Sequence, residues 1–163
     1  MAINKKKYEQ VILYLCEKLG GEVKGKKKLA KLLYFVDFDF FEKYQTSLTG
    51  DTYKAFPMGP FPVALDRVTL EMMKKNLLTI KKSGERNGYI PTEVYHCMIE
   101  FDRSVFSGEE KKMLDRVVTR YGHLNGKQLE DLAHNEAPYI GVELKTEIPY
   151  ELSFYRGTDF SDL

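Results

Sequence analysis

The sequence has no apolar run that approaches the ~20 residues needed to cross a bilayer. Lysines stand at residues 5, 6 and 7, but a charged helical pattern follows them instead of the uninterrupted apolar core of a signal peptide. The two cysteines, Cys16 and Cys97, lie far apart in apolar stretches, which is typical of buried reduced thiols and not of a disulfide framework. We therefore expect a cytoplasmic protein without membrane contact.

Motifs for nucleotide, metal or serine chemistry are also missing. Gly50 and Gly59 do not have the spacing of a phosphate-binding loop, and no GxGxxG sequence follows a predicted strand. The three histidines, His96, His123 and His134, are not joined by CxxC or HExxH spacing. No serine lies in a GxSxG elbow. The sequence therefore predicts no cofactor and no metal.

Other catalytic groupings are weakly supported. Asp37 and Asp39 point apart on one predicted helix, unlike an acid-base pair. Cys97 could pair with His134 and Asp51, but nothing in the sequence places these three together, and the alternation around Cys97 favours a packed thiol. We therefore predict a protein that is not an enzyme, and keep a site around His134 and Asp51 as a third hypothesis.

The charge is distributed unevenly along the chain. The net charge is +1, but the first 31 residues hold nine lysines and three glutamates, which leaves an acidic remainder. Such a basic arm can contact nucleic acid or an acidic protein, or be no more than a solvated helix face. Because the arm contains no arginine, the residue best suited to bidentate base contacts, sequence-specific reading of nucleic acid is disfavoured.

The 163 residues suit one domain, and hydrophobic periodicity gives its elements. Helical spacing, capping signals and glycine stops predict helices over residues 8–19, 26–41, 63–75, 107–121 and 125–135. Residues 77–82 and 94–101 are predicted as a β-hairpin. We therefore predict an α+β fold, mostly helical with a small antiparallel β-hairpin or sheet, in one domain over 1–155 with a flexible acidic tail over 156–163.

The helix predicted from residue 26 is apolar on two faces. Leu29, Leu33 and Val36 lie on one stripe, while Tyr34 and Phe38 fall on the other side at 100° per residue. A helix of this kind is either buried between two layers or carries a partner-binding face. We favour a central buried helix.

Two segments, 28–62 and 132–139, resemble the Panacea domain, a family that includes the Soc-type antitoxin and many phage-associated proteins. The first resembles the family in a KLLYF-D helix, a TGD-Y turn and a following GP pair, and the matching residues are Lys31, Leu32, Leu33, Tyr34, Phe35, Asp37, Thr49, Gly50, Asp51, Tyr53, Gly59 and Pro60. The second resembles a late TH-E-PW-like stretch at His134, Glu136 and Pro138. Ala133 stands where the family usually has Thr, and Tyr139 where it usually has Trp.

The resemblance implies a non-catalytic antitoxin that binds a cognate protein toxin and holds it inactive. One member of the family instead delivers its toxin to an AAA+ protease. For this chain we predict a structural role for the motif residues Lys31, Tyr34, Asp37, Gly50, Asp51, Gly59, Pro60, Glu136 and Pro138. Candidate partner-binding residues are Tyr53, Phe56, Met58, His134 and Tyr139, with Tyr53 and Phe56 as anchors beside the basic arm.

The segment TGDTYKAFPMGPFP, residues 49–62, connects two predicted helices. We expect its Thr-Gly-Asp to form a turn in which Asp51 accepts hydrogen bonds from backbone donors. Residues 53–58 would be extended, and Gly59-Pro60 would turn the chain into the next helix. A rigid corner between helices and a partner contact both remain open for this segment. His134 is interpreted as a hydrogen-bonded residue at a helix end.

A DNA-binding regulator is the alternative from another class. The helices predicted over 107–121 and 125–135 are joined tightly enough for a helix-turn-helix. The second helix carries Lys127, Glu130 and Asp131, however, which is a poor surface for phosphate. Nucleic acid is therefore the less favoured partner.

Overall fold

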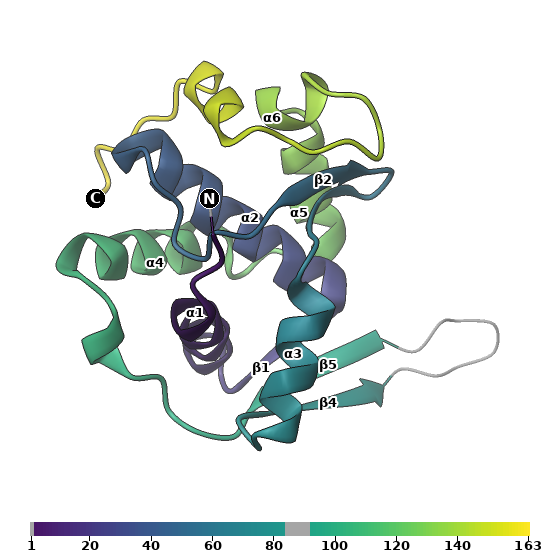
Figure 1. The fold of residues 1–163 in the computed structure, drawn as a ribbon, viewed down its shortest axis with the longest axis vertical. Coiled ribbons are helices and arrows are strands. Elements are labelled where there is room, and N and C mark those ends of the chain that lie inside the picture. The colour runs from purple at the N-terminus through teal and green to yellow at the C-terminus, as the bar shows by residue number, and fades with distance from the viewer. Residues whose placement is uncertain (1, 84–91) are drawn as a thin grey trace.

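Helix α2 (Lys26–Tyr44) runs through the middle of the molecule, and the other elements surround it (Figure 1). The protein is described by a computed structural model that covers residues 2–83 and 92–163. Every residue of α2 from Leu29 to Phe41 is buried, including its charged side chains. The prediction of a central buried helix is confirmed, because both of its apolar stripes are covered.

Helix α1 (Lys5–Lys18) precedes α2 and ends at the predicted glycine pair. Its first turn is capped by Asn4, whose side chain accepts a hydrogen bond from the backbone of Lys7. Both glycines that follow have positive φ angles, +89° at Gly20 and +97° at Gly21. Glycine adopts this conformation without steric cost, so the chain reverses there.

A three-stranded antiparallel sheet lies beside α1 and helix α3 (Leu65–Lys74). Its strand order is β1 (Glu22–Lys24), β5 (Thr92–Cys97), β4 (Leu78–Ser83). The predicted hairpin of β4 and β5 is confirmed, and its predicted tip, 84–91, lies outside the described residues. Strand β1 was not predicted, because three residues are too few to show an alternating pattern.

A second hairpin joins α2 to α3. It consists of β2 (Tyr53–Phe56) and β3 (Gly59–Pro62), with Pro57 and Met58 in its turn. The prediction that Gly59-Pro60 form the turn into the next helix is wrong, because both pair with β2 as part of a strand. The two prolines of β3 lack N–H groups and so suit an edge strand, which the structure places beside α2.

The other edge of this hairpin is covered by the segment 145–148. The backbone N–H of Ala55 donates to the carbonyl of Thr146, and that of Ile148 donates to the carbonyl of Tyr53. These bonds satisfy backbone N–H and C=O groups of the edge strand that could otherwise pair with a strand of another chain.

Helices α4 (Gly108–Tyr121) and α5 (Gly126–His134) both pack on α2. A short 3₁₀ turn, η1 (Arg103–Val105), leads into α4. Both predicted capping boxes are present, with a reciprocal side-chain and backbone pair at each helix start. The helix predictions for this half of the chain are confirmed.

After α5 come the short helix α6 (Ala137–Ile140) and the 3₁₀ helix η2 (Tyr150–Tyr155), which lie together above α2 in Figure 1. The segment 156–163 was expected to be a flexible tail, but the structure packs it against α2 and α4. Thr158 donates to Glu42 on α2 through its backbone and its hydroxyl, and Arg116 on α4 bonds to Asp162. These contacts make the segment part of the domain.

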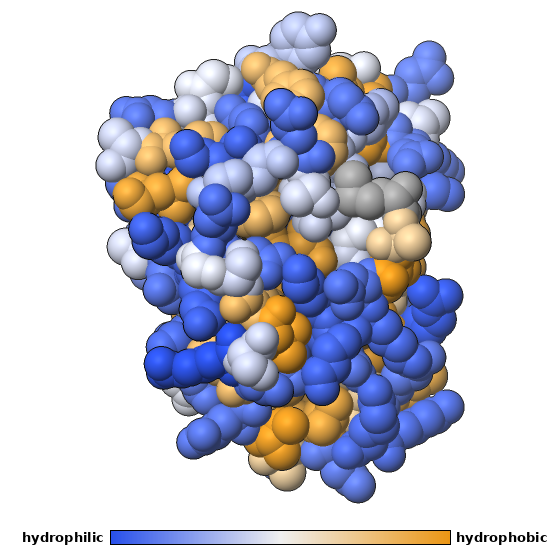
Figure 2. Space-filling model, turned by 60° about the vertical axis from the view of Figure 1, so that its left-hand side comes forward, coloured by the Kyte–Doolittle hydropathy of each residue, from blue (hydrophilic) through white to orange (hydrophobic). Residues whose placement is uncertain are grey.

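The side of the molecule that bears α4 and the C-terminus is mainly hydrophilic. Apolar side chains appear there only in small separate patches (Figure 2). Across residues 2–83 and 92–163, no helix is both long and apolar enough to span a membrane.

Candidate functional site

The Thr-Gly-Asp turn is held to α2 by the buried carboxylate of Asp37. One oxygen accepts the backbone N–H groups of Leu48 (3.0 Å) and Thr49 (2.9 Å). The other accepts the hydroxyls of Thr49 (2.5 Å) and Tyr53 (2.6 Å). Burial raises the pKa of Asp37 to about 6, although these donors oppose the rise by stabilising the carboxylate. Asp37 therefore holds the turn that follows α2 against the helix.

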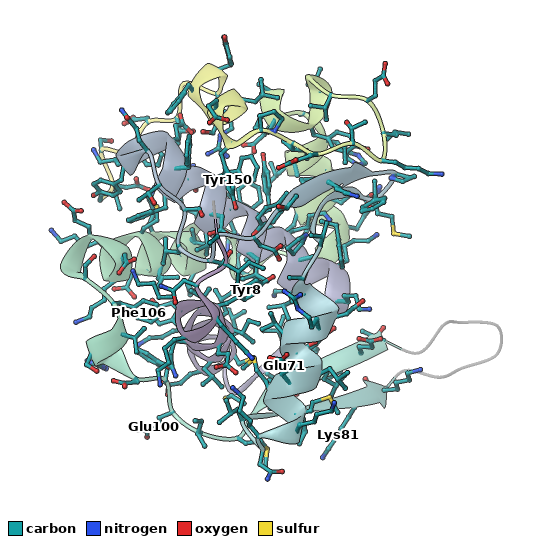
Figure 3. The ribbon with its side chains drawn as sticks, viewed as in Figure 1. Tyr8, Glu71, Lys81, Glu100, Phe106 and Tyr150 are labelled. Atoms are coloured by element: carbon teal, nitrogen blue, oxygen red, sulfur yellow. The ribbon has the colours of Figure 1, made fainter. Side chains whose placement is uncertain are left out.

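Asp51 ties the same turn to both ends of the chain. Its side chain accepts the hydroxyl of Tyr8 at 2.6 Å and the backbone N–H groups of Thr52 and Ala64. Its carbonyl accepts the hydroxyl of Tyr150 at 2.5 Å. The two tyrosines are labelled in Figure 3, near the middle of the molecule. The expected backbone bonding of Asp51 is thus present in the structure.

Gly50 is required where the N-terminal segment crosses this turn. Its φ is +74°, and a Cβ atom at this position would lie 2.1 Å from the carbonyl oxygen of Ala2. That distance is far shorter than any van der Waals contact, so no larger residue fits without moving the backbone.

Tyr53 is part of this buried corner and is only 1% exposed. The ring centroids of Tyr53 and Phe38 lie 5.3 Å apart in an edge-to-face arrangement, and the Tyr53 hydroxyl donates to the Asp37 carboxylate. Its selection as an exposed anchor therefore does not agree with the structure. Its position agrees instead with the other interpretation of this segment, a rigid corner packed against α2.

A network of buried ions occupies the C-terminal half of α2. Asp39 pairs with Arg116 at 2.9 Å and with Arg156 at 2.7 Å. Arg156 also pairs with Glu136 at 3.0 Å, and Glu136 accepts the hydroxyl of Tyr34 at 2.7 Å. Burial raises the pKa of Asp39 to about 6, and the two arginines oppose that rise. The motif residues Tyr34 and Glu136 thus serve to anchor the C-terminal segment.

A cavity opens between the tip of the β2–β3 hairpin and the start of α2, and we call it the hairpin cavity. Its volume is about 490 Å³, and it is lined by Lys26, Lys27, Lys31, Phe56, Pro57, Met58, Gly59 and Phe61. Its walls are almost entirely apolar, and Met58 is 61% exposed at its edge. An accessible apolar cavity with a few polar groups has the general character of a binding site.

Lys31 contributes the buried cation of this cavity. Only 2% of the residue is exposed, and its ammonium donates to the carbonyl of Pro60 at 2.9 Å. Burial lowers the pKa of Lys31 to about 8, because the charged form loses water. Gly59 allows this approach, since a Cβ there would lie 2.7 Å from the Lys31 Cε.

His134, Tyr139 and Phe56 meet behind the hairpin. The rings of His134 and Tyr139 stack with centroids 4.6 Å apart, and the Tyr139 hydroxyl donates to the carbonyl of Phe56 at 2.7 Å. The expectation that His134 is hydrogen-bonded is not met at Nε2, which is buried and has no hydrogen-bond partner among the described residues. A Cβ on Gly59 would lie 3.7 Å from the His134 ring, which places this histidine next to the cavity floor. Pro138 is buried at the start of α6.

The candidate residues thus separate into groups. Lys31, Phe56, Met58 and Gly59 line the hairpin cavity, and Pro60, His134 and Tyr139 contact these residues or their neighbours without lining it. Asp37, Gly50, Asp51 and Tyr53 form the buried corner. Pro57 and Phe61 also line the cavity but were not predicted as candidates, although two aromatic residues flanking a short Pro-Met turn were a usable signal.

A second cavity of about the same volume is lined by Phe35, Arg120, Tyr121, Leu124, Leu132 and Glu136. Its charged groups are already engaged, because Glu136 pairs with Arg156 and Arg120 pairs with Asp162. The hairpin cavity is the better candidate for recognition, because its walls are almost entirely apolar and Met58 is exposed at its edge.

The described residues contain no cluster of three or more His, Cys, Asp or Glu side chains that could hold a metal ion. Cys16 is buried, Cys97 is half-buried, and both are reduced. No hydrogen bond or ion pair joins Cys97, His134 and Asp51 in the described part of the chain.

Comparison with known proteins agrees with the motif positions. The family description "Antitoxin SocA-like, Panacea domain" matches residues 29–139, about two thirds of the chain. This stretch runs from α2 into α6 and contains the buried corner and most of the residues that line the hairpin cavity. No protein of curated function and no solved structure gave a match. The chain belongs to the antitoxin SocA-like family, with a Panacea domain.

Proposed function

We propose that this protein is a non-catalytic antitoxin that neutralises a cognate protein toxin by binding it at the hairpin cavity. The carrying observation is the apolar surface at the hairpin tip, where Phe56, Pro57, Met58 and Phe61 surround an open cavity. Pro57 and Met58 are exposed, so burying them against a partner would release water from apolar surface. Methionine also adapts its shape to different partners.

Lysines beside the cavity add a basic rim for an acidic partner. Lys26 and Lys27 line the cavity and belong to the basic first 31 residues. Both also pair within the domain, with Asp66 and Glu130, so only part of their charge is available to a partner. They lie at the start of α2, and we therefore place the basic contact there and not on a separate arm.

The other function classes receive less support. The carboxylates of Asp37, Asp39 and Asp51 are all engaged in buried hydrogen bonds or ion pairs. On α5, Lys127 pairs with Glu130 and Asp131, so little positive charge remains there for phosphate. These observations favour protein binding over an enzyme or a helix-turn-helix regulator.

The test is a titration of the purified cognate toxin in the absence of protease, and the first candidate to be tried as the toxin is the product of an adjacent gene. Toxin activity should fall in proportion to added antitoxin and reach its floor near equimolar amounts. Met58→Asp should raise the antitoxin concentration required, because it places a charge in the apolar contact. The matched control is Leu70→Asp on α3, which changes a similarly exposed apolar residue outside the cavity.

Complete suppression by far less than an equimolar amount would contradict neutralisation by binding. Suppression that needs an AAA+ protease and ATP would instead support delivery of the toxin for degradation. Equal effects of Met58→Asp and Leu70→Asp would show that the hairpin cavity is not the toxin contact.

A further inference from the structure

The three lysines of the hairpin cavity differ in their partners. Lys26 pairs with Asp66 at 2.9 Å, and Lys27 pairs with Glu130 at 3.1 Å. Lys31 is the most buried of the three, yet within the described residues its ammonium has no carboxylate at ion-pair distance. Its one hydrogen bond is to the neutral carbonyl of Pro60.

A buried ammonium without a carboxylate at ion-pair distance is unusual, because burial removes the water that stabilised its charge. The charge of Glu130 favours the ammonium from a longer distance but does not offset the effect of burial on its pKa. The ammonium has three N–H donors, and the Pro60 carbonyl accepts one of them at 2.9 Å. Because the pKa of Lys31 is about 8, the group is mostly protonated at neutral pH. An anion that entered the cavity would find a cation with spare donors and little competing water.

The remaining lining restricts what this anion can be. Phe56, Met58 and Phe61 surround the cavity with apolar surface and offer almost no polar atoms. A strongly hydrated inorganic anion would lose its water there without replacement. A carboxylate attached to a large apolar side chain would satisfy both Lys31 and the walls.

We propose that the hairpin cavity binds the C-terminal residue of the partner, with the terminal carboxylate on the Lys31 ammonium and a large apolar side chain against Phe56, Met58 and Phe61. This inference rests on the proposed function and names the part of the toxin that is recognised. A chain end carries the carboxylate and the side chain on one residue. An internal segment would have to enter and leave the cavity, and its peptide groups would lack partners among the apolar walls.

The test uses three short peptides and no toxin. The first is acetyl-Gly-Leu with a free carboxylate, the second is its C-terminal amide, and the third is acetyl-Leu-Asp-Leu amide, with an internal carboxylate. Binding is followed by NMR through the methyl group of Met58 and the Cε protons of Lys31. We expect the free acid to bind at least ten-fold more tightly than either amide.

Two variants assign this preference to one lysine. Lys31→Met keeps the length of the side chain and removes its charge, so it should bind the acid and its amide equally. Lys28→Met is the matched control, because Lys28 lies on the same helix but does not line the cavity, and its ammonium donates to the carbonyl of Gly122. It should retain the ten-fold preference.

A measurement on the wild-type protein gives a second readout that does not depend on a variant folding. The pKa of Lys31, followed through its Cε protons, should rise by at least one unit when the free acid is bound, because a nearby carboxylate favours the ammonium. The amide should leave this pKa unchanged.

Equal binding of acid and amide by the wild type would overturn the inference, as would no binding of either. Equally tight binding of the internal carboxylate would overturn the assignment to a chain end. These outcomes are separable from the proposed function. Stoichiometric toxin neutralisation with no peptide preference would reject the terminal-carboxylate contact alone, whereas peptide preference without toxin neutralisation would reject the antitoxin proposal.

Discussion

Helix α2 carries two buried charges whose surroundings differ. Asp39 contacts two arginines, Arg116 and Arg156, one through each carboxylate oxygen. Lys31, two turns earlier on the same helix, has one hydrogen bond to the carbonyl of Pro60. Both residues are almost completely inaccessible to water, so burial alone does not distinguish them.

The difference in partners indicates a difference in role. The ions around Asp39 compensate one another and connect α2, α4 and the C-terminal segment, which is a structural use of charge. Lys31 has no ion pair of this kind, so burying its ammonium lowers the stability of the folded protein. A buried group that lowers stability is a candidate for a role in binding. Substitutions around each of the two charges should therefore separate effects on stability from effects on binding.

Arg156→Met should lower the free energy of unfolding by about 3–5 kcal/mol, because it leaves buried carboxylates without a counter-ion. Asp39, Glu42 and Glu136 all pair with this guanidinium. The control is Arg120→Met, which removes an exposed ion pair with Asp162 and should cost about 0–1 kcal/mol. Denaturant unfolding measures both, and similar losses would contradict a special role for the buried network.

Local signals in the sequence were sufficient for most of the helices. The pairs Ser107 and Glu110, and Asn125 and Gln128, lie three residues apart, so each capping box can be read without knowing the fold. The β2–β3 hairpin was not predicted, because Gly59 is a turn former by local preference. Its place in a strand depends on pairing with Phe56 and on the helix behind it.

The candidate site depended even more on distant contacts. The family resemblance identified Lys31 and His134 as motif residues, but no pattern near Lys31 shows that no carboxylate lies at ion-pair distance from it. That property depends on where the fold places Glu130, which pairs with Lys27 and acts on Lys31 only from a longer distance. The C-terminal segment was likewise misjudged, because Arg156 meets Asp39 across 117 residues.

Gly59→Ala should lower the free energy of unfolding by about 2–3 kcal/mol. Part of the loss is backbone strain at a φ of +104°, and part is the contact of the new Cβ with Lys31, at 2.7 Å from its Cε. Gly21→Ala is a close control, because its φ is +97° and nothing lies within 4 Å of the added Cβ. The loss of unfolding free energy at Gly59 should therefore exceed that at Gly21. Equal losses would mean that the Lys31 side chain moves away from the new Cβ without cost.

The pH dependence of stability should differ between the wild type and Lys31→Met. The pKa of Lys31 is about 8 in the folded protein and near its ordinary value of 10.5 in the unfolded chain. Between these values the unfolded chain binds more protons, so the wild type gains stability as the pH rises. From pH ~7.5 to ~9.5 the gain relative to Lys31→Met should be about 2 kcal/mol.

Comparing the two proteins at each pH removes the contributions of other titrating groups. Parallel stability curves over this range would show that Lys31 has an ordinary pKa in the folded protein. In that case the surrounding groups would stabilise the charged ammonium more than its single hydrogen bond to Pro60 indicates.

Met58→Ala should have the smallest effect on stability, about 0.5 kcal/mol or less, because this side chain is 61% exposed at the hairpin turn. Its effect on toxin binding should be larger, a loss of about five-fold or more in affinity if Met58 contributes to the contact as proposed. Arg156→Met should show the opposite pattern, with strong destabilisation but unchanged toxin affinity per folded molecule. Unfolding measurements and toxin titrations on the two variants would therefore separate structure from recognition along α2. A loss of stability above about 1 kcal/mol in Met58→Ala would place Met58 with the packed residues and remove this distinction.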